Sequence, residues 1–250
     1  MRATGTLAYK AWRESRGRFL AGAAALTFFC VLTATADLNV YPPYERPTYA
    51  QFVWRRVYDG NIRLIFVLLT VMLGLGGLRR EQSVGTAAFT LALPISRRRL
   101  DWTRAAVGFL EMAALACIPL LIVPALSPYY QDIPYPVTQA LPFAVLAVAC
   151  GAAWLAAGFC WSAALGNEHT TAAASLATPF IAMAAANAPG LKRFPGADLF
   201  NIMSGRDLPY LDQEALMLIG PLPWATLAIT VTIAAGVVVL AARITERRDF

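Results

Sequence analysis

Long apolar runs follow one another along almost the whole chain, and few charges interrupt them. Only 14% of the 250 residues are charged, whereas soluble domains carry about 25%. A run of about 20 apolar residues is long enough to cross a membrane as a helix. Helices suit this environment because lipid offers no partner to an unpaired backbone group. The sequence therefore predicts one all-α, polytopic membrane domain over residues 1–250.

Six runs come close to this length and are the predicted membrane spans. They are Phe19–Ala36, Ile62–Leu78, Ala105–Leu126, Ala140–Leu165, Thr171–Asn187 and Leu216–Ala242. The fifth run is short, and Pro179 is expected to break it because proline removes a helical hydrogen bond. Pro221 and Pro223 fall near the start of the sixth run.

Lysine and arginine are unequally divided between the two sides that this topology creates. With six spans both termini share one side, which holds 14 of the 21 Lys and Arg residues. Short loops rich in these residues remain in the cytoplasm. We therefore expect a multi-pass protein of the cytoplasmic (inner) membrane with both termini inside. Arg55, Arg56 and Arg63 are the main basic group on the other side.

The segments that flank the spans also carry patterns. Leu7–Arg18 mixes apolar with basic residues, which predicts an amphipathic interfacial helix; a plain basic flank of the first span is the alternative. The predicted outer loop Asp37–Asn61 is rich in aromatic residues, which favours anchoring at the lipid headgroups or a rim over a substrate exit. In the outer loop Ala188–Glu214, apolar residues from Leu199 to Met203 predict a short helix dipping into the outer leaflet.

The reactive side chains argue against the common classes of membrane enzyme. The single histidine, His169, lies at a predicted membrane edge, and the acidic residues are scattered without close pairing. The four cysteines all fall inside apolar runs and form no CxxC pair, so a Cys/His metal site is not expected. No phosphate-binding P-loop is present, and Gly74–Gly77 predicts close helix packing instead. We expect no catalytic residue and no metal or cofactor site in this chain.

Glu111 is the one ionisable residue placed well inside a predicted span. It follows Arg104 by seven residues, which puts it about 10 Å from the edge of the membrane at the helical rise per residue. A carboxylate at such a position costs roughly 3 kcal/mol. Glu111 must therefore face protein or water, either as a structural polar contact or as part of a cavity in a transport pathway.

The segment 78–104 is the one long interruption on the basic side of the chain. It contains Glu81, then Gly85-Thr86, a leucine-containing stretch, Pro94–Arg97, and a basic run over 98–104. This order resembles the cytoplasmic loop after the second span of ABC-2 type permeases, the membrane subunits of one large class of ABC exporters. The chain length, the six spans and the ending Arg247–Phe250 are similar to that family too.

The resemblance implies that this loop forms a coupling helix seated in a groove of a separate ATP-hydrolysing subunit. Apolar side chains would bury in the groove, and arginines would pair with acidic groups or lipid phosphates. The residues assigned to ATPase coupling on this basis are Glu81, Gly85, Thr86, Phe89, Leu93, Pro94, Ser96, Arg97, Arg98 and Arg99. The amphipathic start would correspond to the interfacial helix of the family.

The expected function is that of a permease subunit in an ABC exporter that moves a hydrophobic or amphipathic cargo. ATP and Mg would be bound by the partner ATPase. The expected partners are that ATPase, a second permease copy or a paralogue, and membrane lipid, with no nucleic acid. Two other hypotheses remain open: a non-catalytic membrane scaffold or accessory protein, and an intramembrane enzyme with dispersed catalytic residues.

Overall fold

The computed structural model describes residues 2–42, 44–76, 96–131, 134–165, 167–190, 198–206, 211–212 and 214–247. Within these residues the regular structure is helical, apart from one isolated β-bridge between Leu211 and Leu218. The prediction of an all-α fold is confirmed.

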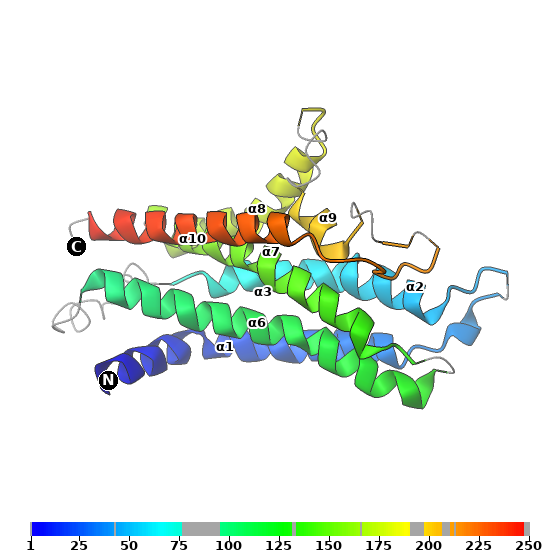
Figure 1. Ribbon diagram of the computed structural model, residues 1–250. Helices are drawn as coiled ribbons and strands as arrows, with labels where there is room; N and C mark the ends of the chain where they lie inside the picture. Colours follow the sequence, from blue (N-terminus) through cyan, green and yellow to red (C-terminus); the bar gives the residue numbers. More distant parts are fainter. Residues whose placement is uncertain are drawn as a thin grey trace.

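Four helices are long and apolar enough to cross a membrane, which marks the chain as a membrane protein. They are α1 (Arg2–Ala34), α6 (Arg97–Tyr130), α7 (Val137–Ala164) and α10 (Trp224–Glu246). Figure 1 shows them along a common bundle axis, with both chain ends at the same end of the bundle. We call this the termini end.

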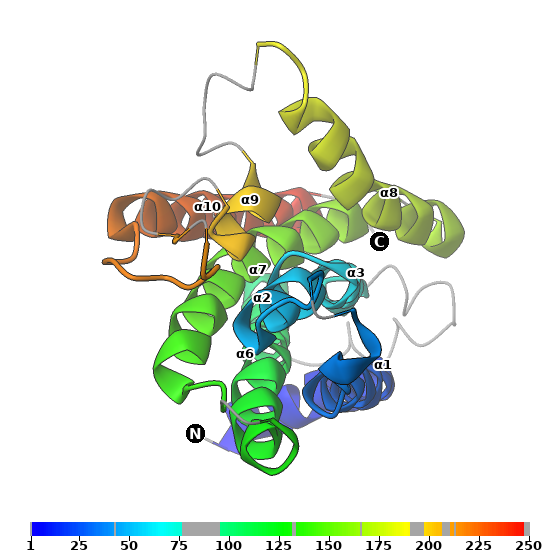
Figure 2. The ribbon, with the colours of Figure 1, turned by 90° about the vertical axis from the view of Figure 1, so that its right-hand side faces the viewer.

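The other two predicted spans correspond to shorter or more polar helices. α3 (Asn61–Leu73) has 13 residues, which gives a length of about 20 Å against a hydrocarbon core of about 30 Å. α8 (Glu168–Ala186) begins with polar residues, packs only against α3 and α7 among the larger helix contacts, and leans away from the bundle in both views (Figures 1 and 2). The structure therefore supports four of the six predicted spans, and membrane crossing by α3 and α8 remains a prediction.

Three boundaries differ from the prediction. The segment Leu7–Arg18 and the first span form one continuous helix, α1, with no break between them. Pro179 lies inside α8 without ending it, so the predicted break is wrong; apolar surroundings favour keeping the remaining helical hydrogen bonds around a proline. α10 begins at Trp224, directly after Pro223, since the fixed φ angle of proline suits the start of a helix.

The end of the bundle opposite the termini carries a compact cap of short helices. It comprises α2 (Tyr49–Val53), the π-helix η2 (Trp54–Tyr58) and α9 (Leu199–Ser204). The predicted short helix near Leu199–Met203 is thus confirmed as α9, and its entry into the outer leaflet remains a prediction. Asp198 caps α9 by accepting hydrogen bonds from the backbone of its first turn, as an N-cap residue does.

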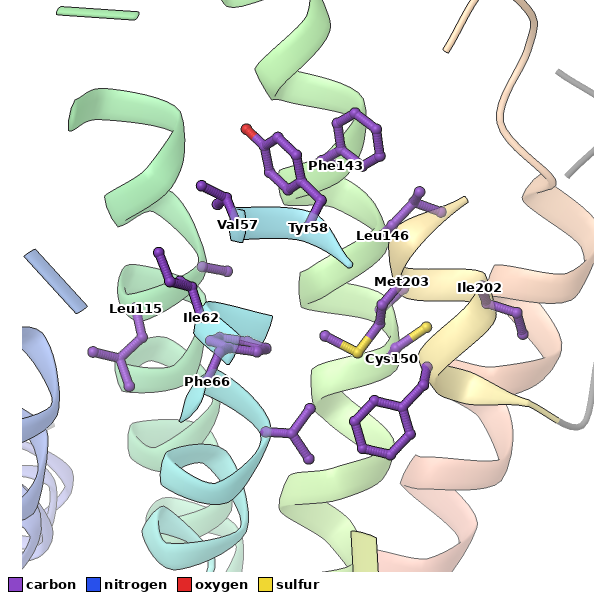
Figure 3. Packing of buried hydrophobic residues seen from close by; sticks show 14 of the residues in the cluster. Val57, Tyr58, Ile62, Phe66, Leu115, Phe143, Leu146, Cys150, Ile202 and Met203 are labelled. Carbon is purple, nitrogen blue, oxygen red and sulfur yellow. The ribbon is translucent and has the colours of Figure 1, made fainter. Parts of the chain in front are cut away.

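Aromatic and aliphatic side chains join the cap to the bundle. Tyr58 stacks on Phe143 of α7 with ring centroids 4.1 Å apart, and Met203 of α9 reaches toward α7 (Figure 3). Tyr49, Trp54 and Tyr58 are all buried. The prediction that aromatic residues of the loop Asp37–Asn61 anchor at the headgroups is therefore wrong for these three, which protein covers.

Candidate functional site

The predicted coupling residues fall into two groups. Those within 77–95 lie outside the described residues; they are Glu81, Gly85, Thr86, Phe89, Leu93 and Pro94. Ser96 is the N-cap of α6 and accepts a hydrogen bond from the backbone N–H of Arg99 at 3.3 Å. Arg97 begins α6, although its side chain lies outside the described part of the chain. Arg98 and Arg99 are exposed in the first turn of α6, at the termini end.

On the other side of residues 77–95 lies Gly74–Gly76, which we call the exit turn. It follows the last residue of α3 and directly precedes residues 77–95. Arg18 of α1 donates from Nη1 to the carbonyl oxygens of Met72 at 2.6 Å and Leu75 at 2.7 Å. The end of a helix has carbonyls without helical partners and a partial negative charge, so a cation there makes short, charge-assisted hydrogen bonds.

α7 supports the exit turn from another side through close backbone packing. A Cβ atom added to Gly74 would lie 2.6 Å from the carbonyl oxygen of Leu155 and 2.9 Å from the Cα atom of Gly158. A Cβ atom on Gly158 would in turn overlap the carbonyl oxygen of Val71. Small residues allow membrane helices to approach at this distance, so the prediction of close packing is confirmed at Gly74.

Gly76 fixes the direction in which the chain leaves the bundle. Its φ of +135° is a conformation that L residues with side chains rarely adopt. Its N–H donates to Ser162 Oγ of α7 at 3.2 Å, and the same hydroxyl donates to the carbonyl oxygen of Gly76. A Cβ atom on Gly76 would also overlap the guanidinium of Arg104 on α6. Side chains of α1, α6 and α7 therefore surround the exit turn.

A cavity of about 170 Å³ lies beside the exit turn. It is large enough for about five water molecules at their share of liquid volume. Its polar lining consists of Arg18, Ser162, Asn167, Glu168 and Thr171. The last three belong to the start of α8, where Asn167 caps the helix by accepting from the N–H of His169 at 2.9 Å. The cavity thus separates part of the exit turn from the start of α8.

Glu111 forms a buried contact between α6 and α1. Glu111 is only 5% exposed, and its Oε1 atom accepts a hydrogen bond of 2.6 Å from Ser15 Oγ. No hydrogen-bond partner of Oε2 occurs among the described residues. Of the two predicted roles, the structure shows the polar contact, and Glu111 is not among the residues that line the 170 Å³ cavity.

The sequence interpretation placed Arg18 in the amphipathic or basic segment Leu7–Arg18 and missed the contacts of Arg18 and Ser15. Their spacing of three residues on one helix was a usable signal, since such residues share a face. The identity of the helices that this face contacts was not visible in the sequence. Ser162 carried no signal at all, because an isolated serine in an apolar run has many possible roles.

The cap has its own polar cluster around Asp59. Arg63 Nη1 lies 3.1 Å from Asp59 Oδ1, and Arg206 Nη2 pairs with Oδ2. Arg63 also donates to the Phe200 carbonyl oxygen at 2.6 Å, and Trp54 Nε1 donates to the Ser204 carbonyl oxygen at 2.8 Å. These bonds connect the two segments of the cap, which are far apart in the sequence.

The interior below the cap is nearly filled. A mainly apolar cavity there has a volume of only about 40 Å³ and is lined by residues of α1, η2, α3, α6, α7 and α9. Burial raises the pKa of the Tyr49 hydroxyl to about 12 and that of Tyr58 well above its usual range, so both rings pack as neutral groups. This cavity leaves little free space beneath the cap.

No protein-family model matches the chain, and no curated protein matches it. The described residues contain no group of three or more His, Cys, Asp or Glu side chains that could hold a metal ion. The functional assignment therefore depends on the sequence pattern and on the geometry of the exit turn and the cap.

Proposed function

We propose that this protein is the membrane-spanning permease subunit of an ABC exporter of the ABC-2 type, driven by a separate ATPase subunit. The observation that carries the proposal is the order of motifs in 78–104: Glu81, Gly85-Thr86, Pro94–Arg97 and a basic helix start. Positive-inside topology alone explains the arginines of this segment, but it does not explain the Gly-Thr and Pro-Ile-Ser pattern.

The geometry around the segment supports this role. The segment joins the exit turn to the Ser96-capped start of α6, and both lie at the termini end. If both termini are cytoplasmic, as the Lys and Arg distribution indicates, the segment faces a cytoplasmic partner. The exposed Arg98 and Arg99 then provide cations for acidic groups on that partner.

The mechanism follows from the two ends of the bundle. Two permease copies, or this chain and a paralogue, pair with two ATPases that hold ATP and Mg. Closure of the ATPases on ATP pushes the coupling segments, and the bases of α3 and α6 move with them. At the opposite end the cap opens and releases a hydrophobic or amphipathic cargo. In this scheme α3 and α8 complete a six-helix subunit within the inner membrane.

The experiment is purification of the tagged protein from its native membrane in mild detergent, followed by identification of the bound proteins. We expect a stoichiometric ATPase of the ABC type with the unaltered chain. The double substitution Arg98→Ala/Arg99→Ala and the substitution Gly85→Pro should each remove it. Arg13→Ala/Arg16→Ala is the matched control, because it removes two exposed arginines of α1 and should leave the ATPase bound.

An intact, folded protein that brings no ATPase would contradict the proposal and favour the scaffold or enzyme hypothesis. Equal loss of the ATPase in the control variant would show that net positive charge, and not the segment, holds the partner.

A further inference from the structure

One turn of α1 contacts both helices that flank residues 77–95. Ser15 donates to Glu111 of α6, and Arg18 donates to the last turn of α3 and to the exit turn. Residues three apart on a helix lie on the same face. A displacement of this turn therefore changes the position of α1 relative to α3 and α6 together.

The Arg18 contact spans the point where α3 ends. Met72 belongs to α3, whereas Leu75 belongs to the exit turn, and Nη1 of one rigid guanidinium contacts both carbonyl oxygens. The planar guanidinium presents five donors in a fixed fork. Movement of Leu75 relative to Met72 therefore either breaks one of these two bonds or moves the Arg18 guanidinium, which is attached to α1.

A second acceptor for Arg18 exists in the interface between α1 and α6. Buried carboxylate oxygens normally have a hydrogen-bond partner, but Glu111 Oε2 has none among the described residues. Arg18 follows by three residues, on the same face of α1, the Ser15 that binds this carboxyl group. The α1 face that carries the Arg18 cation therefore contacts both the α3 carbonyls that Arg18 binds here and a carboxylate with an oxygen that lacks a partner.

We propose that Arg18 is a positioning residue that exchanges its α3 carbonyl partners for Glu111 when residues 77–95 are displaced, and so transmits that displacement to α1. The proposal rests on the proposed function, because it takes the ATPase as the source of the displacement. In the state described here Arg18 holds the exit turn. In the second state it pairs with Glu111, and the contact between α1 and α6 strengthens as the contact between α1 and α3 is lost.

The test is hydrogen exchange followed by mass spectrometry on the full chain with its co-purified ATPase in lipid nanodiscs, without nucleotide and with ATP plus vanadate. Arg18→Met removes the charge and the donors but keeps much of the side-chain length. Arg18→Lys keeps a charge and donors. Arg16→Met is the matched control, because Arg16 is an exposed arginine on the same turn region of α1.

Without nucleotide, Arg18→Met should accelerate amide exchange in residues 73–76 by at least about tenfold, because both charge-assisted hydrogen bonds of Arg18 to this region are lost. With ATP plus vanadate, the unaltered chain should change exchange in both residues 73–76 and residues 11–20. Arg18→Met should abolish the change in 11–20, while Arg18→Lys and Arg16→Met should retain it. The ATPase should remain bound to all four proteins.

The Glu111→Gln variant distinguishes an exchange of hydrogen-bond partners by Arg18 from a permanent contact between Arg18 and α3. It leaves the Arg18 contacts with α3 intact, so exchange without nucleotide should match the unaltered chain. Because it removes the charged second acceptor, the ATP-dependent change in 11–20 should disappear.

The outcomes distinguish the inference from the function on which it rests. An ATP response in 11–20 that survives Arg18→Met or Glu111→Gln would overturn the exchange of partners and leave the permease function standing. Absence of any ATPase with the unaltered chain would overturn the proposed function, and the inference with it.

Discussion

The cap and the exit turn lie at opposite ends of the bundle and are held together by different kinds of contact. In the cap, bonds from side chains to backbone are accompanied by side-chain pairs: Asp59 pairs with two arginines and Tyr58 stacks on Phe143. At the exit turn, side chains bind backbone atoms, as Arg18 and Ser162 do, next to a cavity about four times as large as the one under the cap.

The difference indicates how each end responds to force. A buried side-chain pair such as Asp59 and Arg63 resists separation, because separation leaves an unpaired charge. A cation bound to backbone carbonyls can move to a neighbouring acceptor. We therefore expect the cap to resist opening more strongly than the exit turn.

The largest effect is expected from removal of the charge at the centre of the cap. Asp59→Asn leaves Arg63 without its buried counter-charge, and both side chains are largely buried, with 11% and 15% exposure. We expect a loss of about 3 kcal/mol in the free energy of unfolding, measured by SDS titration in mixed micelles. Lys10→Gln, which removes a cation from a more exposed pair with Glu14, should cost less than about 1 kcal/mol. Equal losses would contradict the cap as a buried electrostatic closure.

A smaller effect is expected at the contact between α3 and α7. Gly158→Ala places a methyl group against the Val71 carbonyl oxygen, and overpacking of this kind costs about 1–3 kcal/mol. Gly236→Ala in α10 is the matched control, since nothing lies within 4 Å of the added atom; it should be neutral or stabilise the helix by about 0.5–1 kcal/mol. Thermal unfolding of the two variants side by side measures the difference. A stable Gly158→Ala variant would show that the exit turn does not depend on close backbone packing.

The smallest effect concerns a single hydrogen bond of the cap. Trp54→Phe removes the bond from Nε1 to the Ser204 carbonyl oxygen, which contributes about 1 kcal/mol. Amide exchange in α9 should therefore accelerate about fivefold, while exchange in 73–76 should not change. Trp224→Phe, at an exposed tryptophan, serves as control. Acceleration at both ends would show that the cap and the exit turn open together in the resting state, and not independently of each other.

The sequence predicted the features that follow from composition over long windows. The four long helices, the all-α fold and the short helix α9 all come from runs of apolar residues with clear borders. The buried polar contact of Glu111 followed from the cost of a carboxylate in lipid. Each of these predictions depended on a local property of the sequence or on the lipid environment, and none required knowledge of which helices are neighbours.

The remaining features depend on tertiary contacts that no local pattern reveals. Tyr49 and Tyr58 are of the residue type that commonly anchors a segment at the membrane interface, but the cap buries them. Pro179 has the local chemistry of a helix breaker, but α8 continues through it. In the sequence, Arg18 looks like one more positive charge on the predicted cytoplasmic side, and only the position of α3 beside α1 makes it a ligand of the exit turn.

The central claim is that the segment between the exit turn and α6 binds an ATPase on the side of the termini. Photo-crosslinking in the native membrane tests it most directly, with p-benzoylphenylalanine placed at Arg98 or, as the comparison, at Tyr44, which is 85% exposed and precedes the cap. The account predicts an adduct between position 98 and an ABC-type ATPase and none from position 44. An ATPase adduct from position 44, or an adduct from position 98 with other proteins only, would contradict it.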